Sequence, residues 1–210
     1  MAFANLKFPE LRLKHGISRE TIYPVTVTGN GTREIRRAQF RWERHVWSIP
    51  SRNLVQADRE DLAVFLKNVN FGLHSFLYQD PLFPEYNGHI LTYRSGTTWY
   101  LTMPNSITSA DDHPFLHPQM GELTFKKNGV TTAATLGGTD STTGLTYINM
   151  TGSINTDVIT AYGPVYFTVR LDSSFGSTIT AMEKSSLGGT CNVVPTVQSI
   201  NDIRLIEVFE

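Results

Sequence analysis

The densest set of side chains able to do chemistry is the run Asp111-Asp-His-Pro-Phe-Leu-His117. Two imidazoles and two carboxylates bind a divalent metal when the backbone brings them together. A helix would align the two histidines, but Pro114 and Pro118 disfavour a regular helix here. We therefore predict a polar surface loop at this run, and no metal site.

Other catalytic arrangements are missing from the sequence. It contains no Gly-x-Ser-x-Gly elbow, no Walker loop and no Gly-x-Gly-x-x-Gly run that opens a helix. The Gly-rich run Gly137–Gly144 is followed by no helical pattern, so we expect a hairpin loop there. The single cysteine, Cys191, cannot form an internal disulfide and has no base beside it. The sequence predicts no catalytic residues, no cofactor and no enzyme.

A local concentration of arginines is the strongest candidate for a contact surface. Its members are Arg33, Arg36, Arg37, Arg41 and Arg44. Arginines on a strand serve as ion-pair donors between subunits, and we predict an interface for this set. The alternative is nucleic-acid binding, with Phe40, Trp42 and Trp47 stacking on bases.

The arginines belong to a predicted hairpin. Residues 18–29 alternate apolar and polar side chains, Asn30-Gly31 is a turn signal, and the return segment is 32–49. Alternation places Phe40, Trp42 and Val46 toward a core, and Arg41 and His45 toward solvent. Phe40 and Trp42 are therefore expected in the core rather than on bases.

One amphipathic helix is predicted over residues 58–70. Asp58 is the expected N-cap, and Gly72 is placed to end the helix. Apolar residues at i, i+3, i+4 and i+7 form one stripe, which must pack on the neighbouring strands. The stripe consists of Leu62, Phe65, Leu66 and Val69.

The remaining sequence reads as short strands separated by turns. The expected strands are Ile90–Tyr93, Thr98–Met103, Gly121–Lys126, Leu145–Asn149, Val165–Leu171 and Ile203–Phe209. Turn signals include Lys127-Asn-Gly and Gly137-Gly138, and a Ser/Gly/Thr-rich loop spans 172–189. We predict a mainly β fold: an antiparallel barrel or sandwich core with one amphipathic helix, plus a second, smaller β lobe.

The composition agrees with a globular chain and narrows its partners. Hydrophobic residues make up 40% and charged residues 18% of the 210 residues, so the chain can bury a core. The net charge of −1 favours neither nucleic acid nor an anionic membrane. No apolar run approaches the roughly 20 residues that span a bilayer, so we predict no membrane anchor. The amino-terminal residues show no secretory signal pattern.

Several motifs, taken together and in order, resemble the distal tail proteins of siphophages and gene transfer agents. They are Gly31-Thr-Arg-Glu-Ile-Arg-Arg-Ala-Gln-Phe-Arg-Trp-Glu-Arg44, Ala63-Val-Phe-Leu66, Asn70-Phe-Gly-Leu-His-Ser-Phe-Leu-Tyr-Gln-Asp-Pro81, Gly121-Glu-Leu-Thr-Phe125, Thr142-Thr-Gly-Leu-Thr-Tyr147, Tyr162-Gly-Pro-Val-Tyr-Phe-Thr-Val-Arg-Leu-Asp172 and Ile203-Arg-Leu-Ile-Glu-Val208. The match runs along most of the chain and is poorest over residues 85–120.

The resemblance implies a structural virion protein at the tail tip of a bacteriophage, assembled in the bacterial host cytoplasm. Such a protein forms a homo-hexameric ring between the tail tube protein on one face and the tail-tip hub, or baseplate, on the other. DNA would pass through the lumen without specific binding. The implied organisation is a tail-tube-like β-barrel core from residues 1–84 with 157–210, and a middle lobe from 85–156.

Two other functions stay open from the residues alone. One is a tail-tip module that binds host-surface glycans through Tyr93, Trp99 and Tyr100. The other is a cell-wall hydrolase, for which the 111–117 run is the only candidate site.

Overall fold

The chain is mainly β, as predicted, and its described residues form several antiparallel sheets and one α-helix. In the computed structural model, the described residues are 3–10, 16–22, 25–29, 34–38, 44–50, 56–70, 73–103, 113–172, 177–178, 199–200 and 203–209. The described strands form open sheets and no closed barrel. No helix in this part of the chain is long and apolar enough to cross a bilayer.

Contacts divide the chain into two units. Unit 1 comprises Met1–Leu77 and Val169–Val208, and unit 2 comprises Tyr78–Thr168 with Phe209–Glu210. Unit 2 extends beyond the middle lobe expected at 85–156 on both sides.

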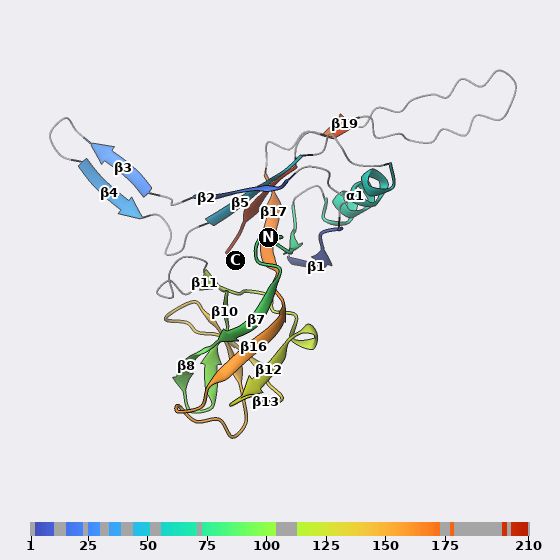
Figure 1. Cartoon of the computed structure of the whole chain (residues 1–210). Helices are drawn as coiled ribbons and strands as arrows, with labels where there is room; N and C mark the ends of the chain where they lie inside the picture. Colours follow the sequence, from blue (N-terminus) through green and yellow to red (C-terminus); the bar gives the residue numbers. More distant parts are fainter. Residues whose placement is uncertain are drawn as a thin grey trace, which may run out of the picture. The chain divides into compact units, whose positions relative to one another are not determined.

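Unit 1 is built on a six-stranded sheet in the order β1-β6-β17-β20-β5-β2 (Figure 1). The bounds are β1 Phe3–Lys7, β2 Ser18–Ile22, β5 Arg44–Ile49, β6 Ser75–Tyr78, β17 Phe167–Leu171 and β20 Ile203–Glu207. β17 pairs antiparallel with β20, β20 with β5, and β5 with β2. β1 pairs parallel with β6, so this edge of the sheet departs from the predicted antiparallel core.

Strand β5 is buried more completely than its alternation predicts. Val46 is 2% exposed, as expected of a core residue, but His45 is only 7% exposed. The prediction that His45 faces solvent is therefore wrong. His45, Trp47 and Ile49 share one face of β5, and Trp47 and Ile49 are fully buried on it. Val46 is buried on the opposite face, so both faces of β5 contribute to the interior.

The predicted helix is present as α1, Gln56–Asn68, two residues earlier than expected. Asp58 therefore lies in the first turn and is not the N-cap. The whole apolar stripe is buried, which confirms its prediction. Phe65 packs edge-on against Phe76 of β6, with ring centroids 4.9 Å apart, and against Phe8 at 5.5 Å. Burying one such side chain stabilises a fold by about 1.5–3 kcal/mol.

The chain leaves α1 through a residue in the left-handed conformation. Asn70 has φ 51°, and the N–H of His74 donates to the carbonyl of Val69. Asparagine tolerates this conformation better than most residues. The predicted terminator, Gly72, lies outside the described residues.

The predicted hairpin of residues 18–49 consists of two ladders with different registers. β2 pairs with β5 up to Ile22 opposite Arg44, and β3 (Val25–Gly29) then pairs with β4 (Glu34–Ala38). Two residues separate β2 from β3, and five residues separate β4 from β5. β3 and β4 form a two-stranded sheet and pair with no other described strand. The Asn30-Gly31 turn lies outside the described residues.

Two further short strands belong to unit 1. β18 (Ser177–Thr178) pairs antiparallel with β19 (Ser199–Ile200). The rest of the predicted loop at 172–189, apart from its first residue, and Cys191 lie outside the described residues.

Unit 2 contains two four-stranded sheets, β13-β12-β16-β7 and β14-β15-β9-β8 (Figure 1). The bounds are β7 Glu85–Ile90, β8 Thr92–Ser95, β9 Thr98–Tyr100, β12 Thr124–Lys127, β13 Val130–Thr131, β14 Thr135–Thr139, β15 Thr146–Asn149 and β16 Ile159–Pro164. A small pair, β10 (Thr102–Met103) with β11 (His113–Pro114), and a 3-10 turn at Met120–Glu122 complete it. The expected strand Ile90–Tyr93 spans the junction of two sheets, and β14 and β16 were not predicted.

Turn chemistry explains one hairpin and corrects another. Asn128 and Gly129 have φ 51° and 85°, and Lys127 lies opposite Val130, so the predicted two-residue turn is confirmed. Gly137 lies within β14, at a bulge between Leu136 and Gly138, and not in a turn. The loop to β15 begins only at residue 140.

Candidate functional site

The predicted arginine interface is divided between two sheets. Arg36 and Arg37 lie on β4, opposite Val27 and Thr26 of β3. Arg33 and Arg41 lie outside the described residues. The described arginines thus lie in two sheets, Arg36 and Arg37 in the β3–β4 pair and Arg44 in the six-stranded sheet.

Arg44 belongs to the six-stranded sheet, where it is the first residue of β5. It is half-buried. Burial lowers the pKa of its guanidinium, the charge of Arg170 lowers it further, and Glu207 opposes both. Arg44 is thus part of a charged group within unit 1 and is not a continuation of the β3–β4 arginines.

A buried histidine–carboxylate contact that the sequence did not reveal lies beside Arg44. The backbone N–H of His45 donates to Glu207 Oε2 at 3.0 Å, and His45 Nδ1 lies 2.8 Å from the same oxygen. The two side chains are only 8% and 3% exposed. A histidine oriented by a carboxylate can act as a general base, but substrate has no access to a pair this buried. We interpret it as structural.

The aromatic side chains expected to bind a glycan do not form an exposed platform. Trp99 is 3% exposed and its indole N–H donates to Ser153 Oγ at 3.0 Å. Tyr93, 37% exposed, packs edge-on against Trp99. The Tyr100 hydroxyl donates to Asp140 at 3.2 Å. Trp99 is thus a core residue, which corrects its expected role.

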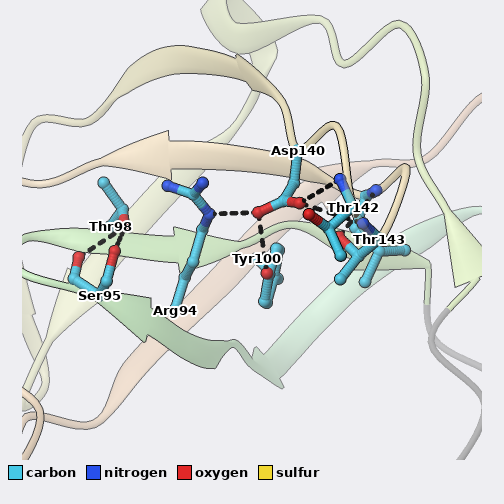
Figure 2. Close-up of polar contacts among 8 residues, drawn as sticks. Arg94, Ser95, Thr98, Tyr100, Asp140, Thr142 and Thr143 are labelled. Atoms are coloured by element: carbon cyan, nitrogen blue, oxygen red, sulfur yellow. Dashed lines mark hydrogen bonds and ion pairs between the residues drawn. The ribbon is translucent and has the colours of Figure 1, made fainter.

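Asp140 is the centre of the most connected polar group in unit 2 (Figure 2). Its Oδ1 accepts the backbone N–H groups of Thr142 at 2.9 Å and Thr143 at 3.0 Å. Its Oδ2 accepts Arg94 Nε at 2.8 Å as well as the Tyr100 hydroxyl. The Thr143 N–H, Arg94 and the Thr142 N–H hold the pKa of the Asp140 carboxyl far below its ordinary value. The carboxylate therefore closes the loop between β14 and β15 and fixes Arg94.

Arg94 in turn covers an aromatic ring. Its guanidinium carbon lies 4.1 Å from the centroid of the Tyr147 ring. On the neighbouring strand, a Cβ added to Gly137 would overlap the Cδ2–Cε2 edge of this ring. Arg94 thus covers the Tyr147 ring, and the network links neighbouring strands of one sheet. A local signal for part of it was present, since aspartate before Ser-Thr-Thr-Gly is typical of a side-chain-capped turn.

The 111–117 run contributes no assembled metal centre that the structure describes. Asp111 and Asp112 lie outside the described residues, while His113 lies in β11 and His117 is half-buried. Within the described ranges no three His, Cys, Asp or Glu side chains are grouped closely enough to hold an ion.

Comparison of the chain with protein-family models gives no match, and comparison with curated proteins gives none either.

Proposed function

We propose that this chain is a structural protein of a phage tail tip, forming a homo-hexameric ring that joins the tail tube to the tail-tip hub. The ordered motifs between Gly31 and Val208 support this proposal. A mainly β chain whose most connected polar groups are engaged within its own sheets suits a scaffold.

The observation that carries the proposal is the β3–β4 hairpin. In the described part of the chain these strands pair only with each other. An isolated two-stranded hairpin is marginally stable at best in water, so this one gains most from a surface supplied by another subunit. β4 carries Arg36 and Arg37, and arginine is a residue type that pairs with carboxylates across interfaces.

Ring symmetry makes this contact heterologous. Each subunit presents one surface to its neighbour and receives a different one, and rotation closes the ring. The hairpin is the presented surface in this proposal. The two faces of the ring then remain for the tube and hub proteins.

The test is native mass spectrometry and electron microscopy of the purified full chain. We expect hexameric rings from the wild type, and monomers from Arg36→Glu combined with Arg37→Glu. Lys126→Glu combined with Lys127→Glu, also adjacent on one strand, reverses the same charge in unit 2 and should leave rings intact. Circular dichroism verifies that each variant folds.

Two results would count against the proposal. Normal rings from the Arg36/Arg37 variant would exclude the hairpin as the contact. A wild-type chain that stays monomeric when mixed with its tail tube protein would exclude the ring itself.

A further inference from the structure

Three Asn-Gly pairs occur in the chain, at Asn30, Asn87 and Asn128. In such a pair the backbone nitrogen of glycine can attack the asparagine side-chain carbonyl, because glycine has no Cβ to obstruct the approach. Asn30 lies outside the described residues. The other two asparagines differ sharply in how their side chains are held.

The Asn128 side chain is held at both ends. Its Nδ2 donates to Asp157 Oδ1 at 2.6 Å, and its Oδ1 accepts the N–H of Val158 at 2.8 Å. The backbone N–H of Asn128 also donates to the Val158 carbonyl. Attack on its side-chain carbonyl therefore requires these bonds to break first.

The Asn87 side chain is exposed and makes no hydrogen bond with the described part of the chain. It lies on the edge strand β7, opposite Tyr162 of β16. The ladder shifts register immediately after it, so Gly88 is the extra residue of a bulge and has φ 77°. A free amide thus precedes a glycine at an irregular point of an edge strand.

We propose that Asn87 is a site of spontaneous deamidation in the folded protein, with water as co-reactant. The Gly88 backbone nitrogen loses its proton and bonds to Asn87 Cγ, while the Cγ–Nδ2 bond breaks and ammonia leaves. Water then opens the resulting succinimide at either carbonyl. The products are aspartate or isoaspartate at position 87.

The two products affect the sheet differently. Aspartate keeps the backbone length and places a carboxylate opposite Tyr162, whose ring carries Lys126 Nζ at 4.4 Å from its centroid. Isoaspartate adds a backbone methylene and displaces Gly88 from the Tyr162 hydroxyl, which lies 3.3 Å from an added Gly88 Cβ. Only the isoaspartate product should loosen β7 from β16.

The experiment incubates the folded chain in mildly alkaline buffer made with heavy-oxygen water, followed by peptide mapping and isoaspartate detection. We expect label to appear at position 87 at least about tenfold faster than at position 128, because Asn128 must first break two side-chain hydrogen bonds. Asn87→Gln, which disfavours the five-membered ring, should abolish the label in that peptide. Asp157→Ala removes the acceptor of Asn128 Nδ2, so it should reduce the difference in labelling rate between positions 87 and 128.

Three outcomes would overturn the proposal. One is equal or slower labelling at 87 than at 128 in the native protein. Another is labelling at 87 that appears only in denaturant. The third is label that persists in the same peptide of Asn87→Gln. The peptide containing Asn30 is separate and does not affect the comparison.

Discussion

Each four-stranded sheet of unit 2 contains a glycine, a tyrosine and a cation in one group, and the two groups differ in how the cation is held. In one sheet, Gly137 on edge strand β14 meets Tyr147, whose ring is covered by Arg94. In the other, Gly88 on edge strand β7 meets Tyr162, whose ring is covered by Lys126. Both glycines occupy β-bulges.

The two groups differ in whether a carboxylate holds the cation in place. Arg94 donates to Asp140, which is itself held by two backbone N–H groups, so the guanidinium is fixed over the ring. The contacts described for Lys126 include no such carboxylate. A guanidinium directs several donors in one plane, whereas an ammonium is a compact charge on a flexible stem. The Arg94–Tyr147 group should therefore contribute more to stability than the Lys126–Tyr162 group. Gly137, whose added Cβ would lie closer to its tyrosine, should tolerate substitution less well than Gly88.

The largest loss of folding stability is expected from Gly137→Ala. The added methyl would overlap the Tyr147 ring, which Arg94 prevents from moving freely. Overpacking of this kind costs about 1–3 kcal/mol, and we expect the upper part of that range in urea denaturation. Gly121→Ala, whose methyl meets nothing within 4 Å, is the control and should change stability by less than about 0.5 kcal/mol. Equal stability of the two variants would remove the role assigned to Gly137.

An intermediate effect is expected from Asp140→Asn, and it should depend on pH. A carboxyl whose folded pKa is depressed contributes stability above its ordinary pKa of about 3.9 and loses that contribution as pH falls toward the folded value. The variant should therefore melt below the wild type at neutral pH. The two melting temperatures should converge in acid. A difference that stays constant from neutral to acid pH would show that Asp140 acts without its charge.

The smallest effect is expected from Lys126→Met, which keeps the aliphatic stem over Tyr162 and removes the charge. An exposed cation–π contact is worth about 0.5–1 kcal/mol, so the free energy of unfolding should fall by no more than that. A double-mutant cycle with Tyr162→Leu isolates the pair. A coupling energy as large as that of an Arg94/Tyr147 cycle would erase the distinction between the two groups.

Local signals account for the elements that were predicted correctly. The α1 stripe and the Asn128-Gly129 turn depend on residues within a few positions of one another, so periodicity and turn chemistry are sufficient to find them. Gly137-Gly138 carries the same local signal as a turn, yet it forms a bulge. The Tyr147 ring on the adjacent strand requires a glycine at position 137 in the bulge, and a rule based on neighbouring residues does not take that ring into account.

The candidate interface was less accessible to prediction than the fold. The sequence located the arginines, but Arg36 and Arg37 lie in the two-stranded β3–β4 sheet and Arg44 lies in the six-stranded sheet. Alternation also misplaced His45, because a strand inside a sheet can be covered on both faces.

Residue types and their spacing were enough to predict a mainly β protein with an amphipathic helix and a hairpin that carries arginines. The strand order, the parallel pairing of β1 with β6 and the burial of His45 depend on tertiary contacts. The physical reason is distance along the chain. His45 is held by Glu207, 162 residues away, and such a partner is selected by packing and register rather than by any neighbouring residue.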